Sequence, residues 1–187
     1  PVRTPMTDNF ASEYYAIKPG TDLAVALAMI NVIVAGKKYN KEFMSKYSDG
    51  AALVDVEKQT HLKTADGMFL AWSAKNKKAV PIDDCDDPAL SGTFTVTIDG
   101  RQVKAKPVLQ LMADATKTYT PEWAAKISDV PAKAIKKIAR DFAAAAPYAM
   151  IPTYKRDAAG PNYANSWRLR HAIQILNSLA GSIDHEG

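Results

Sequence analysis

Five consecutive residues near the N-terminus, "KPGTD" (18–22), have the types and the order that can bind a ligand. They join a predicted short strand to a predicted apolar helix at 23–35, and such a turn presents backbone N–H groups to nucleotides. Gly20 lets a ligand approach the backbone closely, and Thr21 offers a hydroxyl. The Asp22 carboxylate would repel a phosphate but can accept the paired N–H donors of a ring such as guanine. The alternative is that Asp22 only caps the helix.

A second group of polar side chains follows a predicted buried strand, "YAMIPTY" (148–154). Lys and Arg at the carboxyl end of a strand suit a phosphate or carboxylate, and Asn and Tyr can orient a polar ligand. A solvated surface loop is the alternative interpretation. The residues concerned are Lys155, Arg156, Asn162, Tyr163 and Asn165.

Other common chemistries find little support in the sequence. Cys85 is the one cysteine, and the aspartates of "DDCDD" (83–87) would raise its pKa and make it a poor nucleophile. His61, His171 and His185 are scattered, without a second His or Cys at metal-ligand spacing. No dinucleotide-binding glycine motif, P-loop, G-x-S-x-G or C-x-x-C motif occurs. The basic positions of 133–140 are expected to form a solvated helix face rather than a binding patch.

The composition is that of a globular protein with room for one compact domain or parts of two. Of the 187 residues 47% are hydrophobic and 24% are charged. The net charge of +4 is spread along the chain, which argues against nucleic-acid binding and is compatible with an anionic small ligand. The longest apolar run, 23–35, is too short to cross a bilayer.

The elements that must position these residues indicate an α/β fold, specifically part of a Rossmann-like three-layer sandwich with a small β-hairpin insertion. The helix at 23–35 is apolar on all sides, which predicts burial between layers. In the β-rich region 55–106, "TFTVTIDGRQVKAK" predicts a hairpin with a type I′ turn at Asp99-Gly100. Further strands are expected at 15–18 and 148–154, and further helices at 40–47, 107–119, 120–128, 130–146 and 167–179.

Four motifs occur in an order that resembles the catalytic subunits of molybdopterin oxidoreductases of the dimethyl sulfoxide reductase family. They are "RTPMT" followed by "AIKPGTDLAVALAMINVI", then "YNKEF", then "YTPEWAAKISDVPAKAIKKIARDFA", and finally "LNSLAGSIDHEG". Residues 55–106 are similar to an insertion in members related to thiosulfate, polysulfide and tetrathionate reductases and to acetylene hydratase.

The resemblance implies roles for individual residues. Gly20, Thr21 and Asp22 would hold the guanosine end of a molybdopterin guanine dinucleotide that carries molybdenum or tungsten, with Asp22 accepting hydrogen bonds from the guanine edge. Arg3 and Thr4 would lie beside the same nucleotide. The remaining expected positions are Lys155, Arg156 and Asn162 at the cofactor, and Tyr154 or Tyr163 facing the substrate.

The resemblance also implies what should lie elsewhere. The family's metal-ligating residue and its iron–sulfur cysteines have no counterpart in this sequence, so a 4Fe-4S cluster is expected outside the chain. Residues 1–146 would be the second half of a cofactor-binding α/β domain, and 147–187 the start of its neighbour. Both ends look cut, so the isolated chain is expected to be inactive.

The expected partners are the rest of the subunit and an iron–sulfur electron-transfer subunit, with no nucleic acid and no direct membrane span. A periplasmic or membrane-associated parent is favoured over a cytoplasmic one. The alternative function is a non-catalytic α/β module that binds a nucleotide or a protein partner.

Overall fold

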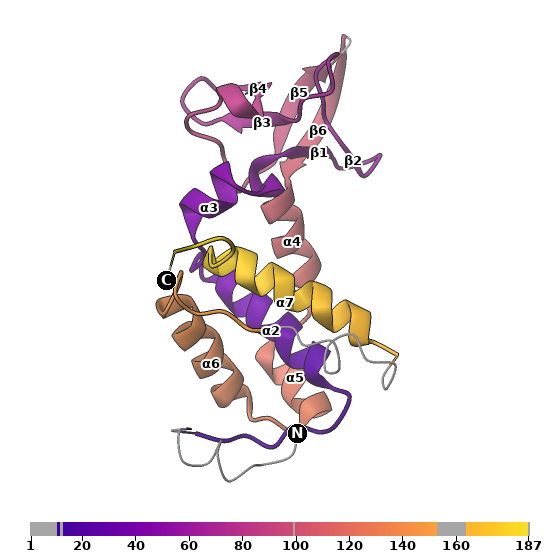
Figure 1. Cartoon of the computed structure of the whole chain (residues 1–187). Helices are drawn as coiled ribbons and strands as arrows, with labels where there is room; N and C mark the ends of the chain where they lie inside the picture. Colours follow the sequence, from indigo (N-terminus) through magenta and orange to yellow (C-terminus); the bar gives the residue numbers. More distant parts are fainter. Residues whose placement is uncertain (1–10, 12, 99, 153–163, 187) are drawn as a thin grey trace. The chain divides into compact units, whose positions relative to one another are not determined.

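The computed structural model describes residues 11, 13–98, 100–152 and 164–186, and these form two compact units (Figure 1). We call the first the helical unit; it comprises the residues up to Lys38 and those from Thr116 onwards. We call the second the β-rich unit; it comprises Tyr39–Ala115. The predicted mixed α/β class with a small antiparallel insertion is confirmed.

The helical unit is built around α2 (Asp22–Ala35), which contacts α5 (Pro121–Ser128), α6 (Ala132–Ala144) and α7 (Ser166–Ala180). Because α2 is apolar on nearly every side, it buries residues against three helices at once. The sequence predicts burial between the layers of a sandwich instead, but no strand is assigned among the described residues of the helical unit. Its buried residues are Ala24, Ala26, Ala28, Met29, Ile30, Ile33 and Val34.

Local signals set where these helices begin and end. The Thr120 side chain accepts a hydrogen bond from the Trp123 N–H (3.1 Å), and Pro121 occupies the first turn of α5, as predicted.

Asn31, the polar residue in apolar α2, donates its Nδ2 hydrogen to the Thr116 carbonyl (2.9 Å). The sequence analysis gives this amide no role; it is a second donor to a carbonyl that also accepts the Tyr119 N–H (3.0 Å).

Two segments predicted as strands are extended or irregular in the structure without belonging to a sheet. No strand is assigned at 13–18 or at 148–152, the described part of the second prediction. A strand requires a ladder of neighbouring strands, and each segment instead has isolated bonds to a helix. Lys18 donates its N–H to the Ser128 carbonyl, and Ile151 is bound by the Asn177 side chain.

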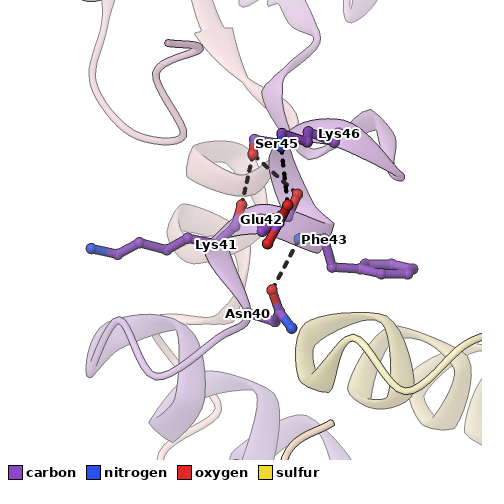
Figure 2. Close-up of polar contacts among 6 residues, drawn as sticks. All are labelled: Asn40, Lys41, Glu42, Phe43, Ser45 and Lys46. Atoms are coloured by element: carbon purple, nitrogen blue, oxygen red, sulfur yellow. Dashed lines mark hydrogen bonds and ion pairs between the residues drawn. The ribbon is translucent and has the colours of Figure 1, made fainter. Parts of the chain in front are cut away.

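The β-rich unit begins with the short helix α3 (Lys41–Lys46), shown in Figure 2. The Asn40 side chain accepts a hydrogen bond from the Phe43 N–H (3.0 Å), which confirms the predicted cap. Lys46 forms an i,i+4 ion pair with Glu42 (3.0 Å) on the exposed face of this helix.

An antiparallel sheet of order β2-β1-β6-β5 forms the main part of this unit. The predicted hairpin is confirmed: Ile98 pairs with Arg101, and Gly100 has a φ of 73° at the turn. Asp99 lies outside the described residues. The strands are β1 (Leu53–Asp55), β2 (Thr60–His61), β5 (Phe94–Ile98) and β6 (Arg101–Pro107).

A second hairpin, β3 (Leu70–Ser73) with β4 (Lys78–Pro81), packs on the core of this sheet. The Trp72 ring stacks on Phe94 with centroids 4.5 Å apart. The helix α4 (Val108–Thr116) follows β6 directly. Two short 3-10 turns, Asp49–Ala51 and Ile82–Asp84, complete the unit.

Candidate functional site

The turn that joins residue 18 to α2 has a fixed backbone geometry. The Thr21 N–H donates to the Lys18 carbonyl (3.2 Å), and Gly20 has a φ of 80°. Pro19 before a glycine of positive φ matches a type II turn, in which the third residue must adopt this conformation. Glycine is therefore required here by the backbone, independently of any ligand.

Thr21 is the N-cap residue of α2, but its side chain does not cap the helix. Its hydroxyl donates instead to the Lys18 carbonyl at 2.6 Å. Its own carbonyl accepts the Ala24 N–H (3.0 Å), the first bond of α2. The Thr21 hydroxyl therefore closes the turn, and its hydrogen is already used.

Asp22 is the first residue of α2 and is half-buried. No hydrogen bond or ion pair to its carboxylate is found among the described residues, so the capping hydrogen bond of the alternative interpretation is not formed. The positive end of the helix dipole favours a carboxylate at this place. Both oxygens remain free to accept hydrogens from a ligand.

The segment that leads into the turn is attached to α5 and α6. The Lys18 N–H donates to the carbonyl of Ser128, the last residue of α5 (2.9 Å). Further upstream, Glu13 accepts the Tyr15 hydroxyl (2.7 Å) and pairs with Lys137 of α6 (3.3 Å). The Tyr15 hydroxyl, and after it Lys137, hold the pKa of Glu13 below its ordinary value. The turn is thus anchored to the region of "YTPEWAAKISDVPAK", another motif of the predicted resemblance.

The other predicted ligand residues lie outside the part of the chain that the structure describes, except for one. Asn165 is exposed at the start of α7 and makes no side-chain cap. The undescribed positions are Arg3, Thr4, Tyr154, Lys155, Arg156, Asn162 and Tyr163.

Asn177 of α7 holds the chain just before the second predicted loop, and sequence reasoning missed it. It is 4% exposed, donates its Nδ2 hydrogen to the Ile151 carbonyl and accepts the Ile151 N–H, both at 2.9 Å. One amide thus satisfies both polar groups of a residue as a neighbouring strand would. The available signal was a polar residue beside Ile173 and Leu176 on the apolar face of a predicted helix.

Among the described residues, the other titratable groups do not form a metal site. Burial raises the pKa of the half-buried Cys85 thiol, and the charges of Asp87 and Asp86 raise it further, which confirms the predicted direction. Within the described ranges, no group of three or more His, Cys, Asp or Glu side chains could hold a metal ion. The same ranges contain no helix with the length and apolar character needed to span a membrane.

Two of the four basic residues of α6, Lys136 and Lys137, form ion pairs. Lys136 contacts Glu122 at 2.6 Å, and Lys137 contacts Asp141 at 2.8 Å. These pairs are exposed and contribute little stability. They support the interpretation of 133–140 as a solvated helix face.

Comparison with known proteins places the chain among molybdopterin enzymes. It is 28% identical to perchlorate reductase subunit alpha of Dechloromonas aromatica over 91% of this chain and 22% of the relative. It is 27% identical to PhsA, the molybdopterin-containing subunit of thiosulfate reductase of Salmonella typhimurium, over 95% of this chain and 15% of the relative. No family model matches the chain.

The fold agrees with a solved molybdoenzyme structure. Acetylene hydratase from Pelobacter acetylenicus superimposes with a TM-score of 0.57 at 21% identity, over 97% of this chain and 16% of that protein. The chain thus spans about a fifth of the length of these relatives or less. It belongs, by its sequence, to the dimethyl sulfoxide reductase family of molybdopterin oxidoreductases.

Proposed function

We propose that this chain is the cofactor-binding part of a molybdopterin oxidoreductase catalytic subunit and that its turn at 18–22 binds the guanine end of a molybdopterin guanine dinucleotide. One observation carries the proposal: the Asp22 carboxylate is half-buried at the end of an anchored turn and has no partner among the described residues. Two other aspartates at turns, Asp55 and Asp87, accept hydrogen bonds from described residues instead.

The residues present fit this group. The guanine edge carries adjacent N1–H and N2–H donors, and a carboxylate can accept both with its two oxygens. Such charge-assisted bonds are about twice as strong as neutral ones. Gly20 has no side chain to block the approach of a base to the turn. When bound, the cofactor would supply redox chemistry at its metal, while this chain would bind and orient it.

The same proposal assigns the remaining parts of the site. Residues 1–146 would belong to the cofactor-binding α/β domain and 147–187 to its neighbour. Lys155, Arg156 and Asn162, which are outside the described residues, would contribute to cofactor binding. The metal ligand, a 4Fe-4S cluster and an iron–sulfur partner subunit would be supplied by sequence outside this chain. The reaction would be a transfer of electrons, oxygen or sulfur on a substrate that remains to be identified.

The test compares two substitutions in the full-length subunit. Asp22→Asn keeps the size of the side chain but replaces one acceptor oxygen by an NH₂ group, which faces a guanine donor. We expect GMP released by acid hydrolysis, and the metal content, to fall by about tenfold or more, since a hydrogen bond to a charged group contributes about 1.5–3 kcal/mol.

Glu122→Gln is the matched control. Glu122 is another carboxylate in the first turn of a helix of the same unit, but it pairs with Lys136. We expect this variant to keep its GMP and metal. Normal GMP content in Asp22→Asn would reject the proposal. A full-length wild-type protein that carries no molybdopterin would favour the non-catalytic alternative.

A further inference from the structure

The position of Asp22 depends on a chain of hydrogen bonds that starts at the end of α5. Ser128 is fully buried and is the last residue of that helix. The last four carbonyls of a helix have no intrahelical donor, and the Ser128 carbonyl receives the Lys18 N–H at 2.9 Å. The Lys18 carbonyl in turn receives both the N–H (3.2 Å) and the hydroxyl (2.6 Å) of Thr21, the residue before Asp22.

The Ser128 hydroxyl fixes the geometry of the helix end that supplies this carbonyl. It donates to the Ala124 carbonyl (2.8 Å) and accepts the N–H of buried Val130 (3.3 Å). Between these two bonds, Asp129 adopts a left-handed conformation with a φ of 63°. Removal of the hydroxyl would leave the Val130 N–H buried without this acceptor, and an unsatisfied buried donor is costly. The helix end would then be free to change its conformation.

We propose that Ser128 is a positioning residue for ligand binding by Asp22. Its side chain holds the end of α5 in the conformation that directs the Ser128 carbonyl to Lys18, and Lys18 fixes the turn from which the Asp22 carboxylate projects. The inference rests on the proposed function, because it concerns the same turn. It adds that a buried serine, which contacts no ligand itself, sets the affinity of that turn for a guanine base.

The experiment measures GMP content in the full-length subunit. Ser128→Ala removes both hydroxyl bonds, and we expect GMP content to fall by about threefold to tenfold, the effect of one net hydrogen bond. Ser128→Thr keeps the hydroxyl and is expected to restore the content. If Ser128→Ala does not accumulate, Ser128→Cys, which keeps a weak donor of similar size, should give an intermediate value.

Ser178→Ala is the matched control, because the Ser178 hydroxyl donates to the Gln174 carbonyl (2.9 Å) in the same i to i−4 arrangement near the end of α7. It has no bond to the turn at 18–22 and should leave GMP content unchanged. Equal losses in Ser128→Ala and Ser178→Ala would overturn the inference, because they would indicate a general effect of weakened helices.

A double-mutant cycle separates positioning from plain destabilisation. If Ser128 acts through Asp22, Ser128→Ala should lower GMP content no further in an Asp22→Asn background, whereas independent effects would multiply. Normal GMP content in Asp22→Asn would reject the proposed function itself. A loss in Asp22→Asn, together with wild-type content in Ser128→Ala, would reject the role of Ser128 alone.

Discussion

Asp55 in the β-rich unit and Asp22 in the helical unit both stand at the end of one element and the start of a turn or helix. The Asp55 Oδ1 atom accepts the N–H groups of Glu57 (2.8 Å) and Lys58 (3.0 Å), and the residue is 5% exposed. The Asp22 carboxylate accepts no hydrogen bond from any described residue. An aspartate carboxylate therefore accepts two backbone hydrogen bonds in the β-rich unit, whereas the one at Asp22 accepts none from the described residues.

Asp87 repeats the behaviour of Asp55. Its carboxylate accepts the Ser73 hydroxyl (2.8 Å) and the Lys75 N–H, and so holds the turn of the β3–β4 hairpin. Asp55 and Asp87 thus accept hydrogen bonds from donors a few residues away or across one hairpin. Asp22 differs from both in that no described residue donates to its carboxylate, which supports its proposed role as an acceptor for a ligand.

The largest expected difference between the two regions is in stability. Asp55→Ala leaves two backbone N–H groups without their acceptor, so we expect the free energy of local opening of the β-rich unit to fall by about 2 kcal/mol. Asp22→Ala loses only its favourable interaction with the helix dipole, about 0.5 kcal/mol. Hydrogen exchange in the full-length subunit, read by mass spectrometry, gives both values. A similar loss of stability in Asp55→Ala and Asp22→Ala would contradict the proposed difference between the two aspartates.

A smaller loss of stability is expected at Gly92. This substitution tests whether contacts within the β-rich unit stabilise that unit. Its φ is +118°, and an added Cβ would lie 2.8 Å from Cζ of Phe94. Gly92→Ala should therefore destabilise the sheet by roughly 1–2 kcal/mol, at most as much as Asp55→Ala. Gly67→Ala is the control for backbone strain without a steric contact, because its φ is +91° but nothing lies within 4 Å of the added Cβ. Faster exchange in β5 and β6 only in Gly92→Ala is the expected result.

The smallest effect is a pH dependence in the β3–β4 hairpin. The Ser73 hydroxyl, and after it the Lys75 N–H, lower the pKa of Asp87 in the folded state. A lowered pKa means that the stabilisation is complete above the unfolded value of about 4 and is lost as the pH falls through the folded value. Asp87→Asn should abolish this dependence. Hydrogen exchange of β3 and β4 between about pH 3 and pH 7, corrected for intrinsic rates, would show it.

Features set by a few neighbouring residues could be predicted from the sequence. The Asn40 and Thr120 caps, the hairpin around Gly100 and the all-round burial of α2 follow from local pattern and are present. Each depends on donors, turn residues or an apolar surface within about one element. Such features carry their physical cause in adjacent residues.

Features that depend on a distant partner could not be predicted. The segment at 15–18 is predicted as a strand, but its observed bonding partner, Ser128, is far away in the sequence. The Asn177 amide that binds Ile151 is also distant in the sequence. The missing capping hydrogen bond at Asp22 could not be predicted either, because an aspartate at a helix start can be a cap or a ligand acceptor. The residue types of the turn were therefore predictable, and the support behind them was not.

The interruption of the helical unit by Tyr39–Ala115 has a consequence during synthesis on the ribosome. The β-rich unit is continuous, so it can fold as soon as it emerges, whereas α2 must wait for α5, α6 and α7. At elongation rates of about 5–20 residues per second, the apolar surface of α2 stays exposed for several seconds or more before α5, α6 and α7 can cover it. Pulldown of ribosome-bound nascent chains should therefore recover chaperones bound to α2 until α7 has been synthesised.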